Sequence, residues 1–251
     1  MNRRSPLIVA HRGDSANFPE NTRVAFDAAL KAGVDGIELD VRLSRDGVPL
    51  ICHDDTLARM GGTTRSLRVQ SAVQIQAVDV GRWKHARFAN QHVPTLAETL
   101  TQCRRTTLFI ELKATGGLGR SAYHRRLVRA VVAVIATYGA AKRVRILCFD
   151  SGVLAEVTRV APHLRRVRNC ERLPRNIARW LTDQPGLHAA CFDRRIVTTD
   201  VIETCHAHGV QVFSWTANDA PAADRLCRIG VDAILSDRPD WLVQHLRKTR
   251  S

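Results

Sequence analysis

Three carboxylates and a lysine stand at strand-like spacing in this 251-residue chain. Glu38 and Asp40 are two residues apart within the run Gly36–Leu43, and Glu111 and Lys113 show the same spacing further on. Residues i and i+2 of a β-strand point to the same face. Because the intervening positions are apolar and would pack against helices, we expect the charged side chains to point together to the opposite face.

Carboxylates that converge in this way repel one another and perturb each other's pKa. A hard divalent cation with oxygen ligands removes the repulsion and keeps coordination positions open for a substrate. We therefore predict that Glu38, Asp40 and Glu111 share one divalent cation. The alternative is that each acid pairs with an arginine.

Two histidines follow apolar runs, His11 directly before Arg12 and His53 directly before Asp54. An imidazole with a pKa of about 6.5 suits general acid–base catalysis near neutral pH. Arg12 offers a planar fork for a phosphate group, and Lys113 offers a point charge. A metal, two histidines, an arginine and a lysine together indicate phosphodiester cleavage. The alternative is that both histidines are structural.

Short apolar runs alternate with helical stretches along the chain. Nine runs have strand character: Leu7–Ala10, Gly36–Leu43, Val48–Cys52, Leu108–Leu112, Val144–Phe149, Arg166–Cys170, Ala189–Phe192, Val210–Trp215 and Val231–Leu235. Eight stretches have helical character: Thr22–Ala32, Leu96–Cys103, Tyr123–Tyr138, Gly152–Val160, Pro174–Leu181, Asp200–His208, Ala220–Ile229 and Trp241–Arg247. Glycine follows four of these stretches, where a helix C-cap is expected.

The second and third strand runs are separated only by residues 44–47, which end in Asp46-Gly47, a hairpin signal. So short a connection cannot carry a parallel crossover, and the two runs must be antiparallel. Eight strands then remain, each leading into a helix, which predicts an α/β (β/α)8 barrel of TIM type in a single domain, residues 1–251. An open doubly wound sheet is less favoured because no glycine-rich dinucleotide loop follows the first strand. We expect residues 54–92, which fit no βα unit, to form a small inserted subdomain.

The same residues resemble the signature of a known enzyme family. The matching positions are His11-Arg12-Gly13, Pro19-Glu20-Asn21-Thr22, Glu38-x-Asp40-Val41, His53-Asp54, Glu111-x-Lys113, Trp215-Thr216-x-Asn218 and the segment from Gly230 to Pro239. They occur in order over nearly the whole chain and resemble glycerophosphodiester phosphodiesterases of the bacterial cytosolic type. One departure is Cys148-Phe149, where many members have Ser-Phe.

The resemblance implies hydrolysis of glycerophosphodiesters to sn-glycerol 3-phosphate and an alcohol. It implies Mg²⁺ or Ca²⁺ held by Glu38, Asp40 and Glu111, with His11 and His53 as general acid and base. We expect Arg12, Lys113 and Trp215 to contact the substrate. Glu20 and Asn21 are expected to hold Arg12 and His11 in place.

Several alternatives stay open at this stage. Pro19–Thr22 is also an ordinary helix start, and Trp215 could be a core aromatic. The order of the two histidines, the nucleophile (the glycerol 2-hydroxyl or water), the leaving alcohol and the oligomeric state are all undecided.

Charge and composition test rival functions. The formal net charge is +14, and 33 of the 38 basic residues are arginine. Such a chain favours anionic partners, but the arginines are scattered and aromatic residues make up only 5%, which argues against a nucleic-acid partner. A lipid phosphodiesterase of phospholipase D type, a basic nucleic-acid-binding protein and a catalytically silent sensor are the rivals. The cysteines are scattered, no signal-peptide core follows Pro6, and no run is long enough to span a membrane. These features predict a cytoplasmic protein, and we expect a small-molecule substrate.

Overall fold

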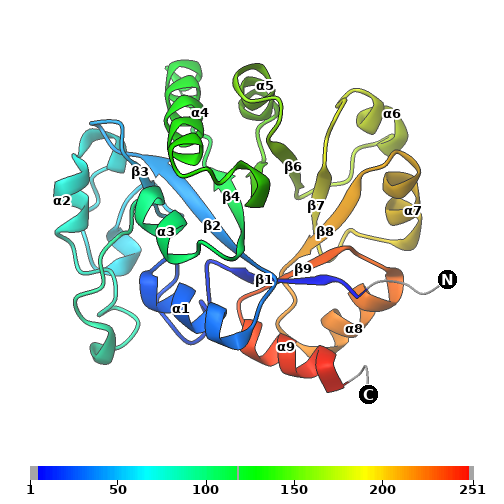
Figure 1. The fold of residues 1–251 in the computed structure, drawn as a ribbon, viewed down its shortest axis with the longest axis horizontal. Helices are drawn as coiled ribbons and strands as arrows, with labels where there is room; N and C mark the ends of the chain where they lie inside the picture. Colours follow the sequence, from blue (N-terminus) through cyan, green and yellow to red (C-terminus); the bar gives the residue numbers. More distant parts are fainter. Residues whose placement is uncertain (1–4, 118, 249–251) are drawn as a thin grey trace.

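Alternating strands and helices build a closed ring of parallel strands in this computed structural model, which describes residues 5–117 and 119–248 (Figure 1). Neighbours in the ring follow chain order, and β1 pairs with both β2 and β9 to close it. The ring strands are β1 (Leu7–His11), β2 (Gly36–Leu43), β4 (Thr107–Leu112), β5 (Val144–Cys148), β6 (Arg165–Cys170), β7 (Ala189–Asp193), β8 (Gln211–Trp215) and β9 (Ala233–Ser236). The predicted (β/α)8 barrel is confirmed.

The remaining strand, β3 (Pro49–Ile51), lies outside the ring, where it pairs with β2 and forms an isolated bridge with Thr95. The pairing is antiparallel, with Val41 opposite Ile51 and Leu43 opposite Pro49. The predicted hairpin is therefore confirmed. Because β3 runs back along β2, the Cys52 N–H donates to the Asp40 carbonyl at 2.9 Å, and His53 follows beside Asp40.

Helices surround the ring (Figure 1). They are α1 (Arg23–Ala32), α3 (Leu96–Gln102), α4 (Arg120–Thr137), α5 (Ser151–Val160), α6 (Ile177–Thr182), α7 (Thr199–Ala207), α8 (Ala220–Ile229) and α9 (Pro239–Lys248). The boundaries agree with the sequence pattern to within three residues, and Gly33 and Gly230 end α1 and α8 in the left-handed conformation. None of the helices in the described part of the chain combines the length and apolar character that crossing a bilayer would need.

The segment between β3 and α3 contains only α2 (Ala72–Gln76) and three 3₁₀ turns, at Ala58–Met60, Leu67–Val69 and Ala86–Phe88. In Figure 1 its helix α2 lies beside β3, outside the ring. It has an apolar cluster of its own, formed by Leu50, Cys52, Leu57, Met60, Leu67, Ala72, Ile75, Val80 and Val93. Its predicted bounds at residues 54 and 92 stay a proposal.

Strand alternation divides the ring into an outer and an inner face. Ile37, Leu39 and Val41 of β2 belong to the cluster that packs against the helices, so Glu38 and Asp40 point into the barrel. The floor beneath them is apolar and consists of Val9, Phe109, Leu147, Val167, Ala189, Cys191, Phe213, Ala233 and Leu235. The polar residues therefore occupy the upper part of the barrel interior, at the carboxyl ends of the strands.

Candidate active site

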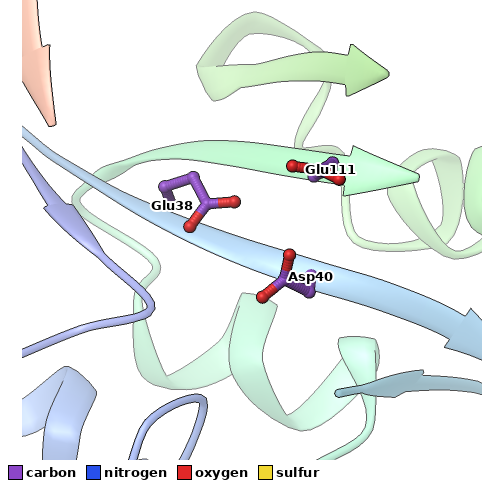
Figure 2. A group of neighbouring side chains, drawn as sticks. All are labelled: Glu38, Asp40 and Glu111. Atoms are coloured by element: carbon purple, nitrogen blue, oxygen red, sulfur yellow. The ribbon is translucent and has the colours of Figure 1, made fainter. Parts of the chain in front are cut away.

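Three carboxylates face one another at the carboxyl ends of β2 and β4. Strand register sets Asp40 opposite Glu111 and His11 opposite Glu38. One oxygen from each of Glu38, Asp40 and Glu111 lies within 4.8 Å of the others, and all three side chains are buried (Figure 2). This is the convergence that the spacing predicts.

Burial acts to raise the pKa of all three carboxyl groups, but neighbouring cations reverse the shift at Asp40. Burial, followed by the charge of Asp40, raises the pKa of Glu38 to about 8. Burial also raises the pKa of Glu111. For Asp40 burial acts the same way, but Lys113 and Arg12 together hold its pKa well below the ordinary range.

A cluster with this arrangement is suited to a hard divalent cation. All the donors are carboxylate oxygens, which Mg²⁺ and Ca²⁺ prefer. Glu38 would ionise readily only with additional positive charge nearby, and an ion among the three groups would supply that charge. The residues present therefore fit the cation that the sequence predicts.

Lys113 lies among the acids. Its Nζ is 2.8 Å from Asp40 Oδ1 and 2.5 Å from Glu111 Oε1. Burial lowers the pKa of this amine, but the two carboxylates more than offset the effect and raise it. Lys113 thus offsets acidic charge, and its predicted contact with phosphate stays a proposal.

His11 is held by the last strand of the barrel. Its Nδ1 lies 2.6 Å from Asp237 Oδ1, and its Nε2 lies 3.9 Å from Glu38 Oε2. A carboxylate can only accept, so Nδ1 carries a proton and Nε2 is left for chemistry. Burial lowers the pKa of His11, but the bond to Asp237 and the charge of Glu38 outweigh it and raise the pKa.

His53 is oriented by its neighbour in the chain. Its Nδ1 lies 2.7 Å from Asp54 Oδ1, and its carbonyl oxygen accepts a hydrogen bond from Arg42 Nε at 2.8 Å. Burial lowers the pKa of His53, and Lys113 and Arg12 add to this against the opposing charge of Asp40. Each histidine therefore has one nitrogen bound to an aspartate.

The turn after β1 positions Arg12. Arg12 adopts a φ of 58° and Gly13 a φ of 80°, and a Cβ on Gly13 would lie 2.8 Å from the backbone of Ala25. Only glycine fits there. The Arg12 backbone N–H donates to Glu38 Oε2 at 3.1 Å, so the same turn also fixes one carboxylate of the cluster.

Glu20 and Asn21 both contact this turn, and Asn21 also reaches the carboxylate cluster. Glu20 Oε1 accepts from Arg12 Nη1 at 3.0 Å, as expected. The side chain of Asn21 donates to Asp40 Oδ2 at 2.8 Å, while its backbone N–H donates to the Arg12 carbonyl. The group that holds the His11 ring is Asp237, which is 226 residues away along the chain.

The histidines, Arg12, Lys113 and two of the carboxylates line one cavity of about 160 Å³. Its remaining walls are Leu147, Phe149, Asn169, Glu171, Cys191, Trp215 and Leu235. Trp215 ends β8 and meets Phe149 edge to face, with ring centroids 6.1 Å apart. The thiol of Cys148 is buried and donates to the Leu112 carbonyl instead, so the departure from Ser-Phe does not reach the cavity lining.

Sequence reasoning missed several polar residues of the site, among them Asp237, Asn218 and Asn169. Asp237 and Asn218 lie in segments whose likeness to the family was noted without a role, and Asn218 Nδ2 donates to Asp237 Oδ2 at 2.7 Å. Asn169 donates to Glu111 Oε2 at 3.1 Å from β6. Its position inside Arg166–Cys170, at the inward parity of Val167, is the signal that could have revealed it.

Comparison with known proteins agrees with this geometry. The glycerophosphoryl diester phosphodiesterase family matches the chain over residues 11–241. The chain belongs to this family. A glycerophosphodiester phosphodiesterase of Caldanaerobacter subterraneus is 31% identical over 245 residues, which cover 96% of this chain and 98% of that protein.

Solved structures support the same assignment. A phosphodiesterase from Oleispira antarctica, in complex with the product sn-glycerol-3-phosphate, has a TM-score of 0.89 at 25% identity and covers 97% of both chains. A glycerophosphodiester phosphodiesterase from Agrobacterium tumefaciens has a TM-score of 0.82 at 27% identity over 95% of this chain and 99% of that one. Both the family resemblance and the prediction of an enzyme, a glycerophosphodiester phosphodiesterase, are confirmed.

Proposed function

We propose that this member of the family hydrolyses glycerophosphodiesters to sn-glycerol 3-phosphate and an alcohol in a metal-dependent reaction with two catalytic histidines. The observation that carries the proposal is the common cavity. His11 and His53 come from different elements, yet both line it together with two members of the buried carboxylate cluster. The product seen in the Oleispira antarctica structure supports the identity of the phosphorylated product.

Glu38, Asp40 and Glu111 would hold one Mg²⁺ or Ca²⁺ ion, which when bound supplies positive charge for the phosphoryl oxygens. Arg12, which lines the cavity, contributes a further charge to the same oxygens. Glu20 and Asn21 hold the side chains of Arg12 and Asp40 in position through hydrogen bonds. Lys113 balances the acids and contacts phosphate, and Trp215 packs against the glycerol carbons.

Proton transfer falls to the two histidines in this proposal. One accepts the proton of the nucleophile, and the other donates a proton to the departing alkoxide at its free ring nitrogen. Their aspartate partners, Asp237 and Asp54, fix which nitrogen is free. The nucleophile is either the glycerol 2-hydroxyl or water, and detection of a cyclic phosphate during turnover separates the two routes.

The test is an assay coupled to release of sn-glycerol 3-phosphate from diesters with choline, ethanolamine, inositol and glycerol as leaving alcohols. His11→Ala and His53→Ala should each lower kcat by about 10²–10⁴-fold, while the exposed His163→Ala should have no effect. A nitrophenyl ester, whose leaving group needs little protonation, should restore only the variant that lost the acid. Near wild-type rates in both variants with natural diesters would overturn the two-histidine mechanism.

A further inference from the structure

A chain of ion pairs connects the loop that carries Arg12 with the loop that carries His53. It passes through Arg59, in the segment between β3 and α3. Arg59 Nε donates to Asp54 Oδ2 at 2.7 Å. Its Nη1 and Nη2 donate to the two oxygens of Glu20 at 2.9 and 2.8 Å. We call this group of three residues, Asp54, Arg59 and Glu20, the Arg59 bridge.

Each acid of the Arg59 bridge is bound on its other side to a residue of the site. Asp54 Oδ1 lies 2.7 Å from His53 Nδ1, and Glu20 Oε1 accepts from Arg12 Nη1 at 3.0 Å. The contacts therefore run without a break from His53 to Arg12. Glu20 belongs to the loop after β1 and Asp54 to the loop after β3, and Arg59 joins the two loops.

Charge explains why the bridge matters to these loops. Within residues 5–117 and 119–248, Asp54 Oδ2 and Glu20 Oε2 accept hydrogen bonds from Arg59 alone. Removal of the guanidinium leaves two carboxylates without the cation between them, and like charges move apart. Because His53 and Arg12 are bound to these carboxylates, both would turn with them.

We propose that Arg59 is a positioning residue, which sets the orientation of His53 relative to Arg12 by holding Asp54 and Glu20 together. The inference rests on the proposed function, because it assigns those two residues to catalysis. The Arg59 side chain is 41% exposed, so its ion pairs contribute little to folding stability. A misplacement of about 1 Å at a reacting group, in contrast, costs as much as about 10²-fold in rate.

The experiment compares Arg59→Gln, Arg59→Lys and a matched control by kcat, KM and thermal midpoint. Arg59→Gln should lower kcat by about 10- to 100-fold with KM and the thermal midpoint close to wild type. The kcat of Arg59→Lys should lie between those of wild type and Arg59→Gln, because an ammonium group cannot bind both carboxylates with a planar fork. The control is Arg82→Gln in the same segment, where the arginine is 71% exposed and pairs with Asp79 at 3.6 Å. This variant should match wild type.

A double-mutant cycle tests whether Arg59 acts through Glu20. The Glu20→Gln/Arg59→Gln double variant should be no slower than the slower single variant, because both changes break one connection. Multiplicative losses would overturn the proposal, as would a raised KM with unchanged kcat, which marks direct substrate contact. Unchanged kinetics in Arg59→Gln with an active wild type refutes the positioning role alone, whereas a wild type that releases no sn-glycerol 3-phosphate refutes the proposed function as well.

Discussion

Replacement of Asp237 by asparagine should impair His11 without changing the size of the side chain. Both carboxylate oxygens of Asp237 accept hydrogen bonds: Oδ1 from His11 Nδ1 and Ser15 Oγ, and Oδ2 from Asn218 Nδ2. An amide has one accepting end and one donating end. In either orientation, the Asp237→Asn side chain would therefore face at least one of these donors with its NH₂ group.

The size of the effect follows from the electrostatics of the pair. Burial raises the pKa of Asp237, but the hydrogen bond and charge of His11, with Asn218 and Ser15, lower it to about 2 from an ordinary 3.8. A difference of almost two units is about 2.5 kcal/mol, and it is the net stabilisation that His11, Asn218 and Ser15 together leave after the burial penalty. If this whole free energy is lost in the transition state in which His11 transfers its proton, kcat/KM falls by about 60-fold.

The direction of the pH effect is also fixed. Asp237 helps to raise the pKa of His11, so its removal lowers that pKa. The limb of the kcat/KM profile that reports His11 should move to lower pH, while the other limb stays in place.

The assay is the pH dependence of kcat/KM for Asp237→Asn beside Asp224→Asn. Asp224 Oδ1 lies 2.7 Å from Nε2 of another histidine, His245. This control therefore breaks a histidine–aspartate pair outside the cavity and should leave the profile unchanged. An Asp237→Asn profile that overlays the wild-type curve in height and position would refute the role of Asp237.

Three further outcomes are expected. Glu38→Gln and Glu111→Gln should abolish the thermal stabilisation by Mg²⁺ or Ca²⁺, which for wild type is about 2.7 kcal/mol at a hundred times Kd; the exposed Glu203→Gln should keep it, and retained stabilisation in the cluster variants would exclude the metal site. Gly13→Ala should lower the free energy of unfolding, measured by urea denaturation, by at least about 1–3 kcal/mol, because its φ is 80° and its Cβ would overlap Ala25. The control Gly61→Ala should lose less, because Gly61 has a φ of 79° but open space around it. Equal losses in the two variants would contradict the steric argument. Binding to duplex DNA at physiological salt should be no tighter than about 10⁻⁶ M by fluorescence anisotropy, and a tight sequence-selective complex would show that the net charge serves nucleic acid.

Local rules were sufficient for the barrel and for the carboxylate cluster. The Asp46-Gly47 turn forces β3 to be antiparallel, which leaves eight strands for the ring, and the spacing of Glu38 and Asp40 sends both into it. These inferences depend on neighbours in the sequence. They hold because a tight turn and a strand of period two permit few alternatives.

Contacts between distant loops could not be inferred in the same way. Asp237 reaches His11 only because the ring closes, and Arg59 reaches Glu20 only because a segment without regular strands folds back over the site. Asn21, whose backbone is left-handed, reaches Asp40 of β2 from the loop after β1. In each case the partner depends on the path of a loop, which hydrophobic periodicity does not encode.

The position of β1 between β2 and β9 has a consequence for synthesis on the ribosome. β1 is the first ring strand to be made, whereas one of its two neighbours, Ala233–Ser236, is made after the other seven ring strands. Until that strand leaves the exit tunnel, one edge of β1 has no partner and His11 lacks Asp237. A nascent chain in which Asp237 has not yet emerged therefore cannot complete the hydrogen bonds around His11.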